Sequence, residues 1–307
     1  MTTTLAEPSR ALVDSTPRSA SPHWAVHDLD APLGAVFTDL DTRQPLRADQ
    51  ALALKKALRD RHIVLLRGQQ LDDAQFLRLA RTFGDVFQPP ADVPVLASDP
   101  YGGNTPAIVK VSNVENGVLG HHELSAHADH HWTPVPSSGS LLYALEVPAV
   151  GGDTTWINLA AAYDALDTAI KLQIDGLQLI TYNPFLRRLK PLASGVFPRY
   201  RTPDIEPLTP FEAHPLVRTH PDSGRKILYL DESTEVEVLD LPPAQGQALV
   251  ERLRAHLLQP RFGYTHRWQA GDIVYWDNQA TLHSRSAFDA GERRVLKRIS
   301  LAGSRPF

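Results

Sequence analysis

The chain has 307 residues, of which 42% are hydrophobic and 21% are charged, and its formal net charge is −4. These values are typical of a globular protein, and the slightly acidic balance gives no electrostatic reason to expect nucleic acid or an acidic membrane as a partner. Because the chain has no cysteine, disulfides, zinc–thiolate sites, iron–sulfur clusters and thiol nucleophiles are excluded. Any transition-metal site must therefore use nitrogen and oxygen ligands.

The N-terminal segment is rich in Ser, Thr, Pro and Ala up to about Ser21. This composition predicts a disordered tail over residues 1–21 and a single domain over 22–307. The segment lacks the basic start and apolar core of a secretory signal, and no apolar run approaches the roughly 20 residues of a membrane span. We therefore expect a cytoplasmic protein without a membrane anchor.

The spacing of apolar residues predicts short strands with helices between them. In the first half the expected elements are a strand and turn at 34–42, a helix at 47–59, a strand at 62–67, a helix at 72–83 with Asp72 or Asp73 at its N-cap, and strands at 107–112, 140–147 and 154–158. In the second half they are a helix from 158, a helix at 167–177, a hairpin around 222–224, a helix at 242–258, and strands at 264–268, 272–276, 280–283 and 293–302. This order predicts a mainly β fold, a sandwich or jelly roll with helical insertions.

Two long segments, 88–126 and 182–212, show little periodicity, and loops of this length often carry function. The second segment is basic. It is predicted to be either a solvated loop or a lid-like insertion that closes over an anionic ligand. Both segments are expected to define the substrate.

The most unusual stretch is HHELSAHADHH, which places five histidines within residues 121–131. His127 and Asp129 are two residues apart, so on an extended strand they point to the same face and can converge on one metal ion. The other histidines, His121, His122, His130 and His131, are expected in solvent, in a loop or beside the metal ligands.

His283, on a predicted strand far down the chain, offers a third ligand. Two histidines and one carboxylate form a facial triad that leaves coordination positions open, which suits non-heme Fe(II) activating O₂. A 2-oxo acid chelated there needs a cation for its distal carboxylate. Arg294, eleven residues past His283, offers a bidentate guanidinium, and the hydroxyl of Thr154 offers a second hydrogen bond.

The motifs HADHHW, GGDTTW, WDNQATLH and GERRVLKR resemble those of the Fe(II)/2-oxoglutarate-dependent dioxygenases of the taurine dioxygenase and chlorophenoxyacetate dioxygenase family. The resemblance covers residues from about Gly34 to Gly303. It implies a double-stranded β-helix, which is a cupin-like jelly roll, with Fe(II), 2-oxoglutarate and O₂ as cofactor and co-substrates. It also implies hydroxylation of a C–H bond in a small anionic substrate, with succinate and CO₂ as co-products, and a dimer or tetramer.

The resemblance assigns roles to seven residues, and the family's pattern is matched at each of them. These are His127, Asp129 and His283 as iron ligands, Thr154 and Arg294 as partners of the distal carboxylate of 2-oxoglutarate, and Arg298 and Trp132 as substrate contacts. Arg298 has an alternative interpretation as the partner of an internal ion pair. If hydroxylation occurs next to a heteroatom, the product is expected to collapse with cleavage of a C–S, C–O or C–N bond.

The chain departs from the taurine enzyme at two places. Gln88-Pro89-Pro90 stands where that enzyme has a substrate-binding histidine, and HELSA lacks its asparagine before the first iron ligand. Taurine is therefore not the expected substrate. Asp129, in place of the small residue of related halogenases, favours hydroxylation over halogenation.

Two other functions use the same residues. A zinc hydrolase would bind its metal through the same His/Asp set, but it would leave Arg294 without a role. A non-enzymatic jelly-roll binding module would bind its ligand without iron.

Overall fold

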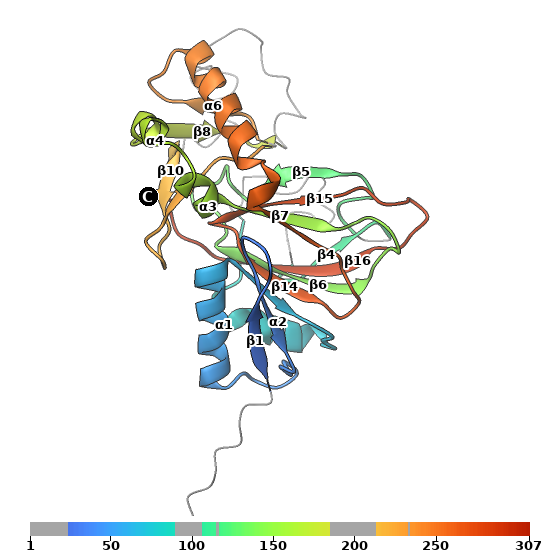
Figure 1. Cartoon of the computed structure of the whole chain (residues 1–307). Coiled ribbons are helices and arrows are strands. Elements are labelled where there is room, and N and C mark those ends of the chain that lie inside the picture. The colour runs from blue at the N-terminus through green and yellow to red at the C-terminus, as the bar shows by residue number, and fades with distance from the viewer. Residues whose placement is uncertain (1–23, 90–105, 115–116, 185–212, 233) are drawn as a thin grey trace, which may run out of the picture.

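The structure is a computed structural model, and it describes residues 24–89, 106–114, 117–184, 213–232 and 234–307. The predicted tail at 1–21 and most of the predicted lid at 182–212 lie outside the described residues. Two sheets face each other at the centre of the molecule, and helices cover the outer face of each sheet (Figure 1). The predicted jelly roll with helical insertions is confirmed.

The larger sheet has seven strands. Its order is β1 (Ala25–Asp28), β2 (Ala35–Thr38), β3 (Ile63–Leu66), β14 (Ile273–Asp277), β6 (Gly139–Glu146), β16 (Val295–Leu301) and β4 (Val109–Ser112). The strands pair antiparallel except for β2 and β3, which are parallel. The smaller sheet has the order β13 (Gly263–His266), β7 (Thr154–Asn158), β15 (Thr281–Arg285) and β5 (Leu124–His127), and all its pairs are antiparallel.

The central strands of the larger sheet are apolar throughout because both of their faces are covered. In β14, all five residues are buried. Ile273 and Tyr275 pack toward the helices on the outer face, whereas Val274 and Trp276 pack between the two sheets. This alternation follows from the two-residue period of a strand. It means that residues of even number in β14 face the smaller sheet.

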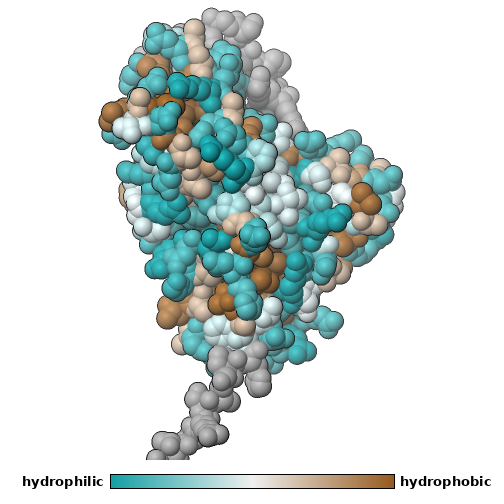
Figure 2. Space-filling view, viewed as in Figure 1, coloured by the Kyte–Doolittle hydropathy of each residue, from teal (hydrophilic) through white to brown (hydrophobic). Residues whose placement is uncertain are grey.

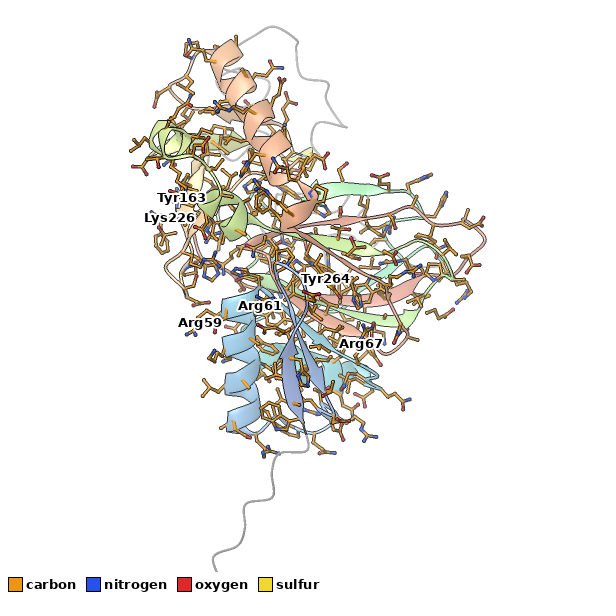
Figure 3. All side chains as sticks on the ribbon, in the orientation of Figure 1. Arg59, Arg61, Arg67, Tyr163, Lys226 and Tyr264 are labelled. Carbon is orange, nitrogen blue, oxygen red and sulfur yellow. The ribbon has the colours of Figure 1, made fainter. Side chains whose placement is uncertain are left out.

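Helices α1 (Ala48–Arg61) and α2 (Asp73–Arg81) pack on the outer face of the larger sheet. The predicted N-cap of α2 is confirmed at Asp72, whose carboxylate accepts from the backbone N–H of Gln75 at 2.7 Å while the Gln75 side chain accepts from the backbone N–H of Asp72 at 3.0 Å. Such a capping box satisfies backbone donors that the helix leaves free. At the end of α1, Arg61 donates to the carbonyl oxygen of Ala31 at 2.9 Å and ties the helix to the loop after β1 (Figure 3).

The outer face of the smaller sheet packs against a second group of helices. These are α3 (Leu159–Asp164), α4 (Thr168–Ile174) and α6 (Pro243–Leu257), followed by the 3₁₀ turn η2 (Pro260–Phe262). Two small sheets complete this part: β12 (Val236–Val238), β8 (Gln178–Thr181) and β9 (Ala213–Pro215) form one, and the hairpin β10 (Val217–Thr219) and β11 (Lys226–Leu228) forms the other. The hairpin confirms the turn predicted at 222–224.

The structure adds short strands that apolar spacing did not predict: β1, β9 and β12. Each has three or four residues and lies at the edge of its sheet. On the face shown in Figure 2, hydrophilic residues cover most of the surface and apolar residues form small separate groups. Within the described residues, no helix is long and apolar enough to cross a membrane.

Candidate active site

His283 and His127 lie opposite each other on neighbouring strands of the smaller sheet. In β15, Leu282 packs into the core on the outer face, so His283 points between the two sheets. There its ring contacts that of Trp276 with 4.9 Å between centroids. The register pairs His283 directly with His127, and their ring centroids are 4.2 Å apart. The antiparallel pairing of β5 and β15 therefore brings together two histidines from distant parts of the sequence.

Asp129 reaches the same place from a turn, not from a strand. The sequence argument placed His127 and Asp129 on one extended strand, but β5 ends at His127 and Asp129 begins the turn that follows. Asn278 fixes this turn: its side-chain oxygen accepts from the backbone N–H of Asp129 at 2.8 Å, and its side-chain nitrogen donates to the Asp129 carbonyl at 2.8 Å. The convergence was correctly predicted, but its cause is the bond to Asn278.

His127, Asp129 and His283 offer ligand atoms that all lie within 4.8 Å of one another. Nε2 of His127 is 3.9 Å from Oδ1 of Asp129. Burial, and then the charge of His127, lowers the pKa of His283 to about 3, so its imidazole is neutral. Burial opposes ionisation of Asp129, but the charge of Arg298 holds its pKa well below the usual range. A neutral imidazole and an ionised carboxylate are the forms that bind a divalent metal, so the residues present fit an iron site.

Asn278→Ala is expected to weaken Fe(II) binding about 10- to 100-fold, because residues that orient metal ligands contribute on that scale. The substitution leaves the backbone N–H and carbonyl of Asp129 without their partner, so the turn no longer holds the carboxylate toward the histidines. Anaerobic equilibrium dialysis against Fe(II) measures the change. The matched control is Gln279→Ala, which removes a buried 3.0 Å hydrogen bond to Arg218 but touches none of the three residues. Equal losses in both variants would mean that general destabilisation is the cause.

A cavity between the two sheets extends from the histidines to three arginines. Its side chains come from both sheets and from the loop before β5, and they are Val111, Leu119, Leu124, His127, Leu142, Thr154, Trp276, His283, Ser284, Arg285, Arg294 and Arg298. In β16, Leu296 packs between the sheets whereas Ile299 packs toward the helices, so Arg298 faces the cavity with Leu296. The cavity thus combines apolar walls with positive charge.

Arg294 lies at one end of this cavity with 2% of its surface exposed. Its Nε donates to the carbonyl of Gly152 at 3.1 Å. Gly152 has a φ of +69°, and a Cβ there would lie 3.1 Å from both Cδ and Nε of Arg294, so glycine is required for the close approach. Burial, and then the charge of Arg285, lowers the pKa of Arg294 to about 9. The guanidinium is therefore held where its charge is unfavourable, and an anionic ligand would relieve that cost.

Thr154 begins β7 and lines the same cavity. Its Oγ1 accepts a hydrogen bond from Nε1 of Trp268 at 2.9 Å. Because the indole N–H can only donate, the hydroxyl proton of Thr154 stays available for an acceptor such as a carboxylate. Thr154 and Arg294 line the same cavity and both can donate hydrogen bonds, and their joint role toward one carboxylate stays a prediction.

Arg298 forms the ion pair that the alternative interpretation predicted. Its Nη1 lies 3.3 Å from both carboxylate oxygens of Asp129, and its side chain is 11% exposed. Arg298 also lines the cavity, so its guanidinium contacts both Asp129 and the cavity. A position next to a proposed metal ligand is compatible with a substrate contact.

Trp132 is buried and is not among the described residues that line this cavity, so its predicted substrate contact stays a prediction. The chain turns at His130, whose φ is +60°, and this carries Trp132 away from the face of β5. His130 stacks on Phe87 with 4.1 Å between centroids and contacts Oγ of Ser137 at 2.9 Å.

The remaining histidines of the stretch divide between core and surface. His131 is buried, with Nδ1 3.5 Å from Oδ2 of Asp231, and His122 is exposed.

Sequence reasoning missed three residues around the site: Asn278, Trp268 and Arg285. Asn278 and Trp268 act through hydrogen bonds to residues more than a hundred positions away, which no local pattern reveals. Arg285 had a usable signal, because it lies two residues after His283 on the same strand and therefore faces the same way.

Comparison with known proteins gives one family. The family described as "Taurine catabolism dioxygenase TauD, TfdA family" matches residues 25–300. The chain is 31% identical over 277 residues to the alpha-ketoglutarate-dependent 2,4-dichlorophenoxyacetate dioxygenase of Cupriavidus pinatubonensis, covering 85% of this chain and 92% of that protein. It is 30% identical over 289 residues to the (S)-phenoxypropionate/alpha-ketoglutarate-dioxygenase of Sphingobium herbicidovorans, covering 92% and 96%.

A solved structure is similar over the same length. The crystal structure of AAD-2 in complex with Mn(II) and N-oxalylglycine superposes with a TM-score of 0.73 at 28% sequence identity, covering 92% of this chain and 98% of that chain.

Proposed function

Because this chain belongs to the TauD/TfdA family of dioxygenases, we propose that His127, Asp129 and His283 hold its iron, and that Thr154 and Arg294 hold the distal carboxylate of its co-substrate. The chain is an Fe(II)- and 2-oxoglutarate-dependent oxygenase that uses O₂. The observation that carries the site assignment is the convergence of the three metal-binding side chains in one cavity with a buried arginine. Family membership decides against a zinc hydrolase and against a non-enzymatic binding module.

Bound Fe(II) couples the oxidative decarboxylation of 2-oxoglutarate, which yields succinate and CO₂, to hydroxylation of a substrate C–H bond. The protein residues bind the metal, the co-substrate and the substrate, and they orient them. In this proposal the triad would hold the metal and Arg294 would hold the distal carboxylate of the co-substrate; His127, His283 and Arg294 line the same cavity. The apolar walls, Leu142 and Trp276 among them, keep water from the reacting atoms.

We propose that the substrate is a small carboxylate with an apolar body, such as an aryloxyalkanoate. The apolar side chains of Val111, Leu119 and Leu124 line the cavity, and Arg298 offers a cation for the substrate's anionic group. The two relatives from Cupriavidus and Sphingobium are named for acids of this class. Hydroxylation at the carbon beside the ether oxygen gives a hemiacetal, and its collapse would cleave the C–O bond.

A panel of aryloxy acids, alkyl sulfates, sulfonates and amino-acid derivatives, scored by succinate formation in the presence of Fe(II) and ascorbate, tests this proposal. We expect aryloxyalkanoates to stimulate succinate release at least about tenfold more than taurine, a difference of about 1.4 kcal/mol. Preference for taurine, or for amino-acid derivatives, would contradict the proposed substrate class. The Arg298→Gln variant should lose discrimination between a substrate acid and its methyl ester.

We also propose that the enzyme is a homo-oligomer, a dimer or a tetramer, and that it acts in the cytoplasm. The family resemblance supports the first statement. Light scattering after size-exclusion chromatography measures the oligomeric state, and cell fractionation measures the location.

A further inference from the structure

Arg285 is a second buried guanidinium in the cavity, and neither the sequence motifs nor the proposed function gives it a role. It ends β15, two residues after His283, with 5% of its surface exposed. The register places it directly opposite Thr154 on β7, so the two side chains project from adjacent positions on one face of the sheet. Arg285 therefore lies next to a residue that we assign to the distal carboxylate.

The guanidinium of Arg285 is fixed by the loop that precedes β5. Its Nη1 donates to the carbonyl of Leu119 at 3.2 Å, and its Nη2 donates to the carbonyl of His122. Neutral carbonyls orient the group but do not neutralise it. Its Nε is buried and has no hydrogen-bond partner among the described residues. A buried donor without a partner is costly, so this side of the group is suited to an additional acceptor.

Arg285 and Arg294 together place two positive charges in the lining of one cavity. Neither forms an ion pair with a carboxylate among the described residues; Arg294 bonds to the carbonyl of Gly152 instead. Both guanidiniums belong to buried residues: Arg285 has 5% of its surface exposed and Arg294 has 2%. Two like charges in a poorly solvated cavity repel each other, and a single anion between them removes both the repulsion and the loss of hydration.

We propose that Arg285 is a co-substrate-binding residue, and that its guanidinium and that of Arg294 jointly neutralise the distal carboxylate of 2-oxoglutarate. This inference rests on the proposed co-substrate site at Thr154 and Arg294. Arg285 makes the cavity selective for 2-oxo acids that carry a second carboxylate, because a monocarboxylic 2-oxo acid leaves both guanidiniums uncompensated.

Binding of two 2-oxo acids to the anaerobic Fe(II) enzyme tests the proposal without turnover. The probes are 2-oxoglutarate and 2-oxopentanoate, which has the same carbon chain but no distal carboxylate, and the readout is the absorbance band that forms when a 2-oxo acid chelates Fe(II). We expect Arg285→Gln to raise the Kd of 2-oxoglutarate about tenfold, the scale of one charge-assisted hydrogen bond, and to change the Kd of 2-oxopentanoate by less than about twofold. Arg285→Lys, which keeps the charge, should retain most of the discrimination.

Three outcomes decide the matter. An equal loss for both probes in Arg285→Gln would show that the residue only supports the loop, and no loss for either would show that it is not in the site; both overturn the proposal. If Arg285→Gln does not fold, the Arg285→Lys variant carries the test: a Kd raised more for 2-oxoglutarate than for 2-oxopentanoate supports the proposal, and equal changes for the two probes overturn it. A different variant shows whether the proposed co-substrate site itself is wrong. In that case Arg294→Gln would leave the Kd of 2-oxoglutarate unchanged.

Discussion

The Asp129→Ala variant is expected to lose Fe(II) binding and to form succinate at least about a thousandfold more slowly than the unmodified enzyme in the presence of substrate. Asp129 supplies the only carboxylate among the three side chains whose ligand atoms converge. Two neutral imidazoles, His127 and His283, cannot balance the charge of a divalent ion in a buried site. Equilibrium dialysis against Fe(II) and coupled succinate detection measure the two effects.

The interpretation of this variant depends on Arg298, which loses its partner at the same time. Arg298 is 3.3 Å from the Asp129 carboxylate, and removing one member of a largely buried ion pair costs up to about 3–5 kcal/mol of stability. His283→Ala removes a ligand without breaking that pair, so it separates loss of metal from loss of stability. The control is His122→Ala, which removes an exposed histidine of the same stretch. Retention of Fe(II)-dependent succinate formation in both Asp129→Ala and His283→Ala would contradict the assignment of these residues as iron ligands.

The sequence predicted which three side chains converge, but it did not predict the backbone structure that brings them together. His127 and Asp129 were correctly expected to converge, but the argument used a strand where the structure has a turn. The turn depends on Asn278, a residue 149 positions from Asp129. A bond of that kind belongs to the tertiary structure and has no local signature. The order of the motifs could therefore identify the site, although their spacing could not describe its geometry.

Strands such as β6 and β14 were predicted because five or more consecutive residues are buried, which gives a continuous apolar run in the sequence. Strands were missed where three residues pair at the edge of a small sheet, as in β9 and β12. The substrate contacts stay predictions. Trp132 was predicted from its position in a motif; it is buried, follows the left-handed residue His130, and is not among the described residues that line the cavity.

The Arg294→Gln variant is expected to bind 2-oxoglutarate about a hundredfold more weakly. A guanidinium that donates two hydrogen bonds to a carboxylate in a buried site contributes about 3 kcal/mol, which corresponds to two orders of magnitude in Kd. Arg294 has 2% of its surface exposed and donates from Nε to the neutral carbonyl of Gly152, so its charge is available for the co-substrate. Arg294→Lys keeps the charge but not the planar fork, and a loss of about tenfold is expected.

Arg293 provides a control that few sites offer, because the adjacent residue has the same chemistry in a different environment. Its side chain is 60% exposed, and it pairs with Glu146 on β6 at 2.6 Å. Arg293→Gln and Arg294→Gln each remove one positive charge from the same dipeptide, so the two variants have the same net charge. The exposed charge is screened by water and salt, whereas the buried one is not. If direct contact anchors the co-substrate, Arg294→Gln alone should raise the Kd of 2-oxoglutarate. If both variants raise it equally, the anchor is the general positive potential and the assignment of Arg294 is wrong.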